Sequence, residues 1–210
     1  YTLKGNIPHY VSESNTQPGM PKYKDLNGDG IIDTNDRTMI GRGLPIHTGG
    51  FTNNFEYKGF DLSVFFQWSY GNDVLNANRL FFDSGFQKKR ELNQYASYTN
   101  RWTPENPNSD IPAATNSSSN LVISSRVVED ASFLRLKTVT LGYTVPKTFL
   151  KKYKIDNARL YVAAQNLWTI TGYSGYDPEV SIRSGGLTPG LDFSSYPRAL
   201  SVSFGINLGF

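Results

Sequence analysis

The chain contains no cysteine, which excludes disulfide bonds, thiol catalysis and Cys-ligated zinc. It has only two histidines, His9 and His47, so we expect no histidine-based metal site. No run of 18 apolar residues occurs, which excludes a helical membrane protein. The formal net charge of the 210 residues is only +3, too small to indicate a nucleic-acid partner.

Aromatic side chains are abundant: 13 Phe, 13 Tyr and 3 Trp make up 14% of the residues, beside 19 Gly. This composition, with short alternating runs, favours a β-rich chain. The chain begins at Tyr1, with no start Met, no basic segment and no apolar leader. We therefore expect a processed or excised piece, from which the absence of a targeting signal says little about location.

Apolar and polar residues alternate in five segments, and this period of two predicts β-strands. Only Lys58 and Gly59 separate the first two segments, which predicts a tight hairpin. In the third segment the leucines before Lys137 occupy even-numbered positions, and the apolar residues after it occupy odd-numbered positions. This change of parity predicts a bulge near Lys137, or a strand that extends beyond its apolar surroundings. The five segments are residues 51–57, 60–70, 133–145, 158–168 and 200–210.

The last segment distinguishes between β architectures. Its large residues all fall on one face, while the other face carries only Ser, Asn and Gly. A soluble sandwich usually has charged residues on its solvent face, whereas a transmembrane barrel combines a lipid-facing apolar face with a polar lumen. We therefore predict an all-β chain of about five antiparallel strands from a transmembrane β-barrel. The predicted lumen residues are Ser63, Gln67, Tyr161, Gln165, Ser201, Ser203 and Asn207.

Connection lengths support this assignment. The links after Tyr57 and Val145 are short, whereas those after Tyr70 and Trp168 are long, as in barrels with short periplasmic turns and long extracellular loops. Five strands leave open edges, so the chain must belong to a larger assembly. The predicted divisions are an extracellular loop region (1–47), a hairpin (48–70), a long extracellular loop (71–131), a second hairpin (132–169), an extracellular loop (170–197) and the C-terminal barrel strand (198–210).

Six blocks of sequence carry a resemblance to a known family. The blocks are residues 21–33 (PKYKDLNGDGIID), 57–63 (YKGFDLS), 101–107 (RWTPENP), 128–137 (VEDASFLRLK), 141–146 (LGYTVP) and 172–180 (GYSGYDPEV). In this order along the chain they resemble the C-terminal region of SusC/RagA-type TonB-linked outer-membrane proteins of Bacteroidota. Val127, where an aromatic residue is expected, and the turn at residues 44–48 depart from the pattern.

The resemblance implies a large, plugged transmembrane β-barrel of about 22 strands in the outer membrane, of which this chain forms the C-terminal antiparallel strands, about five in number. It would import glycans or peptides together with a SusD-like surface lipoprotein and be powered by TonB, which would contact a part of the protein outside this chain. Outer-membrane lipid is then a further partner, nucleic acid is not, and no enzymatic activity is expected. The alternating C-terminal residues Phe204, Ile206, Leu208 and Phe210 also resemble the signal by which such barrels are recognised for assembly.

Residues 25–36 carry the sharpest motif. Oxygen-bearing residues and a central Gly30 follow the spacing of an EF-hand-type calcium loop, with the final Glu replaced by Asp36. We predict a structural calcium ion, and the alternative is a loop that orders itself through Asx turns without metal. The predicted ligands are Asp25, Asn27, Asp29, Ile31 through its carbonyl, Asp33 and Asp36.

Loop aromatics are the candidates for substrate binding, because aromatic rings stack on sugars. The competing interpretation, favoured for any single residue, is that a long loop needs a small core of its own. Trp68, Tyr70 and Trp168 are expected to form an aromatic girdle at the membrane edge. The substrate-binding candidates are Trp102, Tyr95, Tyr98, Tyr173 and Tyr176, and Phe81, Phe82 and Phe86 lie in the same long loop.

Two rival interpretations belong to other classes of protein. The first is a secreted, calcium-stapled all-β module for carbohydrate binding or adhesion, and the second is a hydrolase accessory domain. Carboxylate pairs such as Glu129 and Asp130 have no spacing that supports glycoside hydrolysis. The basic run at residues 151–154 is expected to be a solvated turn. Detergent dependence distinguishes the transporter from both rivals.

Overall fold

The computed structural model describes residues 9–10, 16–85, 93–116, 121–180 and 189–210. The chain divides into two compact units, each built from three stretches of sequence. Unit 1 comprises residues 1–41, 75–129 and 181–194, and unit 2 comprises residues 42–74, 130–180 and 195–210. Among the described residues, no helix is both long and apolar enough to cross a membrane.

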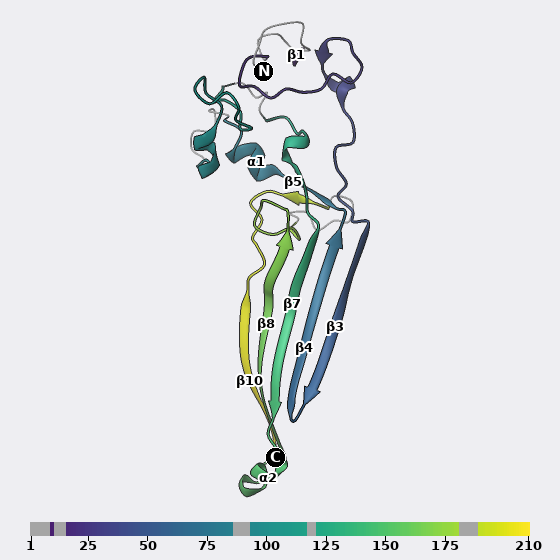
Figure 1. Ribbon diagram of the computed structural model, residues 1–210, viewed down its shortest axis with the longest axis vertical. Helices are drawn as coiled ribbons and strands as arrows, with labels where there is room; N and C mark the ends of the chain where they lie inside the picture. Colours follow the sequence, from purple (N-terminus) through teal and green to yellow (C-terminus); the bar gives the residue numbers. More distant parts are fainter. Residues whose placement is uncertain (1–8, 11–15, 86–92, 117–120, 181–188) are drawn as a thin grey trace. The chain divides into compact units, whose positions relative to one another are not determined.

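Unit 2 is dominated by one five-stranded sheet with the order β10-β8-β7-β4-β3, in which every neighbouring pair is antiparallel. The long strands lie side by side in Figure 1. This sheet confirms the predicted class of about five antiparallel strands, and it is open, with β3 and β10 at its edges. The strands are β3 (His47–Tyr57), β4 (Phe60–Tyr70), β7 (Phe133–Thr144), β8 (Asn157–Thr171) and β10 (Ser201–Gly209).

The turn between β3 and β4 has only two residues, as predicted. Lys58 and Gly59 both have positive φ, at 47° and 89°, which is the backbone of a type I′ hairpin turn. The turn between β7 and β8 is longer and contains α2 (Lys147–Leu150) and the 3-10 turn η6 (Lys151–Tyr153). Because Phe60 pairs with Tyr143, both turns lie at the same end of the sheet.

The predicted irregularity near Lys137 is confirmed as a bulge. The pairing of β7 with β4 shifts between Phe65 and Phe66, and its pairing with β8 shifts across Lys137. In β8, Asn166 and Leu167 fall between the paired residues, and Asn166 has a φ of 53°. The bulge explains why the apolar face changes parity along the sequence while staying on one side of the sheet.

Unit 1 consists mainly of loops and turns, with short strands and helical segments among them. β1 (His9–Tyr10) pairs in parallel with β2 (Ile31–Ile32), and η2 (Thr34–Asp36) follows. In α1 (Ala77–Phe82) the side chain of Asn76 caps the first turn, because its Oδ1 accepts a hydrogen bond from the Arg79 N–H. Two further 3-10 turns are η3 (Ala96–Asn100) and η5 (Ser125–Val127).

A small three-stranded sheet has the order β6-β5-β9, with β5 at Asp73–Asn76, β6 at Val128–Asp130 and β9 at Leu191–Asp192. Within unit 1, β5 pairs with β9 in parallel through Leu75 and Leu191. Unit 2 has its own small core beside the sheet. It consists of Val74, Ala131, Tyr173 and Val180, all of which are buried.

Candidate functional surfaces of the sheet and its loops

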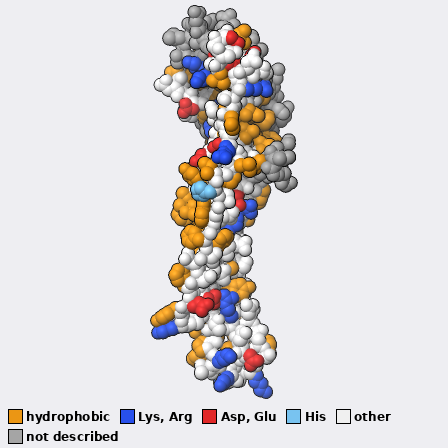
Figure 2. Space-filling model, turned by 90° about the vertical axis from the view of Figure 1, so that its right-hand side faces the viewer, with side chains coloured by type: hydrophobic (Ala, Val, Ile, Leu, Met, Phe, Trp, Pro, Cys, Tyr) orange, Lys and Arg blue, Asp and Glu red, His pale blue; other side chains and the backbone are white. Residues whose placement is uncertain are grey.

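The two faces of the five-stranded sheet differ in chemistry. Paired residues of neighbouring strands share a face, so the register sorts every strand residue to one side or the other. One face carries the large apolar side chains, many of which are exposed, and Figure 2 shows hydrophobic side chains along the strands. Exposed members of this face are Phe51, Phe55, Tyr57, Phe60, Tyr70, Leu141, Leu160, Trp168, Ile170, Val202, Phe204, Ile206 and Leu208.

Aromatic rings mark both ends of the apolar face. At one end the Phe51 ring stacks on Phe66 at 4.9 Å, and the Trp68 Nε1–H donates to His47 Nδ1 at 3.1 Å. At the turn end, the rings of Phe60 and Tyr143 are 4.6 Å apart. The ten residue steps of β4 from Phe60 to Tyr70 span about 33 Å along an extended strand. At the tilt of about 40° that barrel strands have, this length covers about 25 Å of membrane thickness, the height of the apolar band between the aromatic girdles of an outer-membrane barrel.

The C-terminal strand β10 lies at one edge of the sheet and exposes the predicted assembly residues. Phe204 is 82% exposed and Phe210 85% exposed, and Ile206 and Leu208 are also exposed. Phe204, Ile206 and Leu208 share the apolar face, because they pair with Val162, Leu160 and Ala158 of β8. Their role as an assembly signal stays a prediction.

The opposite face is mostly polar and has many small side chains, with Phe65 and Phe133 as its large apolar members. The register brings all seven predicted lumen residues to this face: Ser63, Gln67, Tyr161, Gln165, Ser201, Ser203 and Asn207. Two glycines of the same face make room for larger neighbours. A Cβ on Gly205 would meet the ring of Tyr161, its partner on β8, and a Cβ on Gly142 would meet both Asp61 and Arg159.

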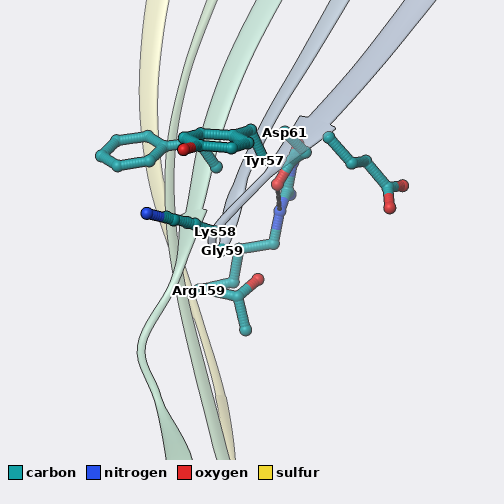
Figure 3. Close-up of a pocket in the computed structure, with 8 residues that line it drawn as sticks. Tyr57, Lys58, Gly59, Asp61 and Arg159 are labelled. Atoms are coloured by element: carbon teal, nitrogen blue, oxygen red, sulfur yellow. Dashed lines mark hydrogen bonds and ion pairs between the residues drawn. The ribbon is translucent and has the colours of Figure 1, made fainter.

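An ion pair crosses the polar face near the turn end. The Arg159 Nε–H donates to Asp61 Oδ1 at 2.9 Å, and Arg159 Nη2 contacts Asp61 Oδ2. Asp61 lies on β4 and Arg159 on β8, so the pair spans the intervening strand β7 above Gly142. Figure 3 shows these side chains at the edge of an open pocket of about 520 Å³. The pocket is also lined by Glu56, Tyr57, Lys58, Gly59, Phe60 and Thr144.

A second charged network lies toward the other end of the polar face. Arg135 on β7 is 2% exposed, and its guanidinium contacts Asp177 at 2.6 Å and Glu179 at 3.1 Å. Glu179 also contacts Lys137 at 3.4 Å and Arg198 at 3.0 Å. These contacts tie the segment around residues 177–179 to the sheet.

Burial raises the pKa of Asp177, but the hydrogen bonds from Arg135 and from the Glu179 and Arg198 N–H groups outweigh it. The net effect holds the pKa of Asp177 below its ordinary value. Asp177 is therefore ionised at neutral pH, which the buried Arg135 beside it requires.

The predicted calcium loop is ordered by its own hydrogen bonds. Asp25 accepts from the Gly28 and Gly30 N–H groups at 2.6 and 2.9 Å, and Asp29 accepts from Ile31 N–H at 2.8 Å. Asp36 accepts from the Leu26 and Asp33 N–H groups at 2.7 and 2.8 Å. These bonds hold the pKa of Asp36 below its ordinary value.

The loop therefore contains the Asx-type bonds of the alternative interpretation. Within the described part of the chain, no group of three or more His, Cys, Asp or Glu side chains is arranged to hold a metal ion. The loop nevertheless has the oxygen donors that calcium prefers, and each carboxylate oxygen that accepts one N–H keeps a second lone pair. The donor set fits calcium in its chemistry.

The loop aromatics fall into different environments. Tyr173 is 6% exposed and belongs to the small core of unit 2, whereas Tyr176, three residues later, is 79% exposed. In unit 1 the Tyr95 ring packs 5.6 Å from Phe82, and the Phe81 ring lies 5.2 Å from Phe193. The packed rings follow the small-core interpretation, and Phe86 lies outside the described residues.

Tyr98 and Trp102 remain close to polar groups of unit 1. The Arg101 guanidinium lies 5.3 Å from the Tyr98 ring, and burial raises the pKa of the Tyr98 hydroxyl. Trp102 packs so closely over Gly19 that a Cβ there would overlap its ring. Trp102 also lines a pocket of about 210 Å³ together with Gly19, Met20, Pro21, Lys22, Pro107, Ser109, Asp110, Pro112 and Arg126.

A buried ion cluster stabilises the same unit. Arg126 Nη2 contacts Asp83 at 3.1 Å, and Arg79 Nη1 contacts Glu129 at 3.3 Å. Burial raises the pKa of Asp83 despite Arg126 and Arg79, and burial also lowers the pKa of Arg126. The cluster pairs groups within the fold and offers no free nucleophile, so a structural role explains it.

Comparisons with known proteins identify the family. The chain is 38% identical to TonB-dependent receptor P3 of Formosa agariphila over 213 residues, which cover 98% of the chain and 21% of that protein. It is 29% identical to the TonB-dependent receptor SusC of Bacteroides thetaiotaomicron, over 95% of the chain and 18% of SusC. No protein-family model matches the chain.

The solved structures agree. The chain superposes on the RagAB peptide importer in the 'closed-closed' state with a TM-score of 0.73 and 29% identity, covering 91% of this chain and 21% of that one. The 'open-open' state gives a TM-score of 0.67 and 32% identity, covering 80% and 17%. The chain belongs to the SusC/RagA-type TonB-dependent receptors. It spans about a fifth of the length of the curated receptors it matches.

Membership of the SusC/RagA-type receptors confirms the resemblance and accounts for the fold, since five antiparallel strands with one apolar face match their β-barrel. Sequence reasoning about this receptor chain missed both charged networks. Two signals were available: Gly142 interrupts a strand, which often marks a close approach, and Arg135 and Lys137 stand on a strand otherwise free of charge. Their partners were not predictable, because Asp61 and Asp177 are distant in sequence.

Proposed function

We propose that the chain is the C-terminal part of a TonB-dependent outer-membrane transporter, which imports glycans or peptides together with a SusD-like surface lipoprotein. One observation carries the proposal: the sheet has an apolar face with aromatic rings at both ends and an opposite face that is mostly polar. A face of this kind suits lipid, and the opposite face suits a water-filled or plugged lumen.

The open edges of the sheet support the same proposal. Each backbone N–H or C=O group without a hydrogen-bond partner in hydrocarbon costs several kcal/mol, about as much as other buried polar groups that lack a partner. Strands β3 and β10 would therefore pair with further strands of the same barrel. TonB would act on a part of the receptor outside this chain.

The relatives suggest the substrate class of the proposed transporter. RagAB is a peptide transporter, and the resemblance to SusC-type receptors extends the choice to glycans. Tyr176, with its ring exposed, is the most available of the predicted substrate contacts in unit 2. Trp102 is the corresponding residue in unit 1, because it lines a pocket. No catalytic role is proposed for any residue.

Adjacent residues of β10 provide a test of membrane placement. Ser203 and Phe204 lie on opposite faces, and the chain has no cysteine of its own. Each is replaced by Cys in the complete receptor and spin-labelled. We expect the label at 204 to collide with lipid-soluble oxygen and the label at 203 with a water-soluble nickel chelate. A soluble secreted module predicts no membrane fraction and no such difference, which would overturn the proposal.

Substrate class is tested separately in cells. A strain that lacks the receptor is grown on single glycans or on peptides as the limiting nutrient, and the lipoprotein that co-purifies with the receptor is identified. Loss of growth on one nutrient class, restored by the receptor gene, assigns that class. Normal growth on every nutrient, with no co-purifying lipoprotein, would contradict the proposed import function.

We also propose that the loop at residues 25–36 binds calcium as a structural ion. The support is the oxygen-donor spacing, together with a hydrogen-bond pattern that already curves the loop around Asp25. Terbium luminescence, sensitised by nearby aromatic rings, reports binding in the complete receptor. We expect the signal to disappear in Asp29→Asn/Asp33→Asn and to remain in Asp110→Asn. Equal signals in all three proteins would leave the Asx-turn loop as the explanation.

A further inference from the structure

The turn between β7 and β8 concentrates positive charge. Residues 146–156, here named the basic turn, contain Lys147, Lys151, Lys152 and Lys154 and a single acidic residue, Asp156. Lys58 in the β3–β4 turn lies at the same end of the sheet. Several Lys and Arg side chains are visible in the lower part of Figure 2. Within the described residues, none of these five ammonium groups takes part in an ion pair.

Exposed aromatic rings accompany the lysines. In the basic turn Phe149 is 70% exposed and Tyr153 is 67% exposed. The Lys152 ammonium lies 5.8 Å from the Tyr153 ring, and the Lys58 ammonium lies 5.2 Å from the ring of Tyr57. Two large aromatic residues thus face water within one short helical segment, where they are available for contact with another surface.

The basic turn is held in a defined conformation. Leu150 is buried, α2 packs against β8, and the Ile155 N–H donates to the Leu150 carbonyl at 3.4 Å. The Val145 N–H donates to the Ala158 carbonyl at 2.9 Å, which closes the turn at the strand ends. Lys154 follows the 3-10 turn η6 and has a left-handed backbone, with a φ of 56°. The exposed rings and lysines are therefore presented by a structured element.

The chemistry of this surface fits a membrane interface with anionic headgroups. Lysines near a membrane surface attract anionic lipids, and aromatic side chains partition into the boundary between headgroups and acyl chains. A soluble anion such as phosphate would satisfy the lysines but leave Phe149 in water. The apolar face of the sheet reaches the same end, where its last rings are Tyr57, Phe60 and Tyr143.

We propose that the basic turn and Lys58 form a binding surface for anionic phospholipid, with Phe149 and Tyr153 inserted at the boundary between headgroups and acyl chains. This inference rests on the proposed function, because it requires the sheet to span a membrane. The lipid belongs to the leaflet on the side of the short turns. The lysines select the headgroup, and the aromatic rings hold the turn against the lipid.

The test measures headgroup selectivity in the complete receptor. Receptor purified in detergent is mixed with equal amounts of phosphatidylglycerol and phosphatidylcholine of identical acyl chains, and retained lipids are counted by native mass spectrometry. We expect a preference for phosphatidylglycerol of about tenfold, from several lysines near the surface. In K147Q/K151Q/K152Q/K154Q we expect the ratio to fall close to one.

A matched variant controls for the loss of four charges. K22Q/K24Q/R37Q/R42Q removes the same number of cations from exposed positions outside the basic turn. We expect this variant to keep the wild-type ratio. An equal ratio of the two lipids in the wild type, or the same loss of selectivity in both variants, would overturn the proposal.

Two further arms separate the rings from the lysines and lipid from free anion. F149A/Y153A should reduce the retention of both lipids while leaving their ratio unchanged. Inorganic phosphate should displace phosphatidylglycerol no better than chloride at equal ionic strength. Specific displacement by phosphate would reassign the lysines to a soluble anion and overturn the lipid proposal.

The outcome is distinguishable from failure of the proposed function. If the receptor is not recovered from the outer-membrane fraction, the transporter proposal fails before lipid selectivity is measured. If it is recovered there, folded and spanning the membrane, but shows no headgroup preference, only the lipid proposal fails.

Discussion

Asp61 and Arg159 form an ion pair across a strand to which neither belongs, and Gly142 of that strand lies beneath their contact. Both side chains are about 30% exposed, so water screens the pair and it contributes little to stability. The absence of a side chain at Gly142 is what permits the bridge between β4 and β8.

Gly142→Ala should open the ion pair between Asp61 and Arg159. Its Cβ would overlap the ends of both side chains, which are flexible and can move aside, so we expect only a small loss of stability. The free energy of unfolding of the complete receptor, measured by the mobility shift of folded barrel in urea, tests this. Gly172→Ala is the control, since no atom lies within 4 Å of its added Cβ. Equal effects of the two substitutions would contradict the proposed role of Gly142.

Acid should release the segment around Asp177 from the sheet. The pKa of Asp177 is depressed in the folded state, so its stabilising contribution is full above the ordinary aspartate pKa and is lost as the pH falls through the folded value. Hydrogen exchange of the Glu179 N–H, which donates to Asp177 at 2.9 Å, reports this release. Asp177→Asn should remove this acid-dependent release. Unchanged pH dependence in that variant would assign it to another group.

Arg135→Met tests how much the buried ion pair between Arg135 and Asp177 stabilises the fold. Removal of the guanidinium leaves Asp177 without its charged partner, and breaking a buried ion pair in this way costs about 3–5 kcal/mol. Lys137→Met is the matched control, because its longer contact with Glu179, at 3.4 Å, is partly exposed. We expect the control to cost less than about 1 kcal/mol. Urea unfolding of the two variants measures the difference.

Tyr173 and Tyr176 should separate stability from substrate binding. Tyr173→Ala removes a ring from the core formed with Val74, Ala131 and Val180, and we expect a loss of about 3–5 kcal/mol. Tyr176→Ala should change the free energy of unfolding by less than about 0.5 kcal/mol, because the side chain is exposed. Under the proposed function, only Tyr176→Ala reduces uptake at unchanged receptor abundance. Normal uptake would remove Tyr176 from the substrate candidates.

Asp36→Ala should loosen the loop at residues 25–36. The two carboxylate oxygens of Asp36 accept hydrogen bonds from the N–H groups of Leu26 and Asp33. Without the carboxylate, both N–H groups can bond only to water. Limited proteolysis should cut this loop faster in the variant than in the wild type. In the wild type, cleavage should become faster as the pH falls through the depressed pKa of Asp36. Asn35→Ala is the control, because its amide makes only a 3.4 Å contact with Asp33. Equal cleavage of both variants would contradict the capping role of Asp36.

Strand positions were predictable because alternation is a local property of the sequence. The two-residue turn at Lys58 and Gly59 and the bulge at Lys137 both left local signals, in turn composition and in parity. The division into loops and hairpins and the site assignments stay predictions. The calcium ligands were proposed from spacing alone, and the structure adds hydrogen bonds that suit either interpretation.

Contacts across long sequence separations were not predictable. Arg135 and Asp177 are 42 positions apart, and Asp61 and Arg159 are 98 apart, so no local pattern connects them. Tyr173 and Tyr176 illustrate the same limit, because identical residues three positions apart have opposite burial. Only the packing of the segment beside the sheet decides which ring is inside.

The bulge between β7 and β8 also fixes how far the strands are offset along each other. A slip of two residues leaves every side chain on its own face, so alternation alone does not oppose it. Here Lys137 must stand opposite Asn166 and Leu167, and Asn166 must adopt a positive φ. A slipped pairing would place that distortion against regular strand and break the ladder there. The irregular site thus selects one alignment among several that the repeating pattern would accept.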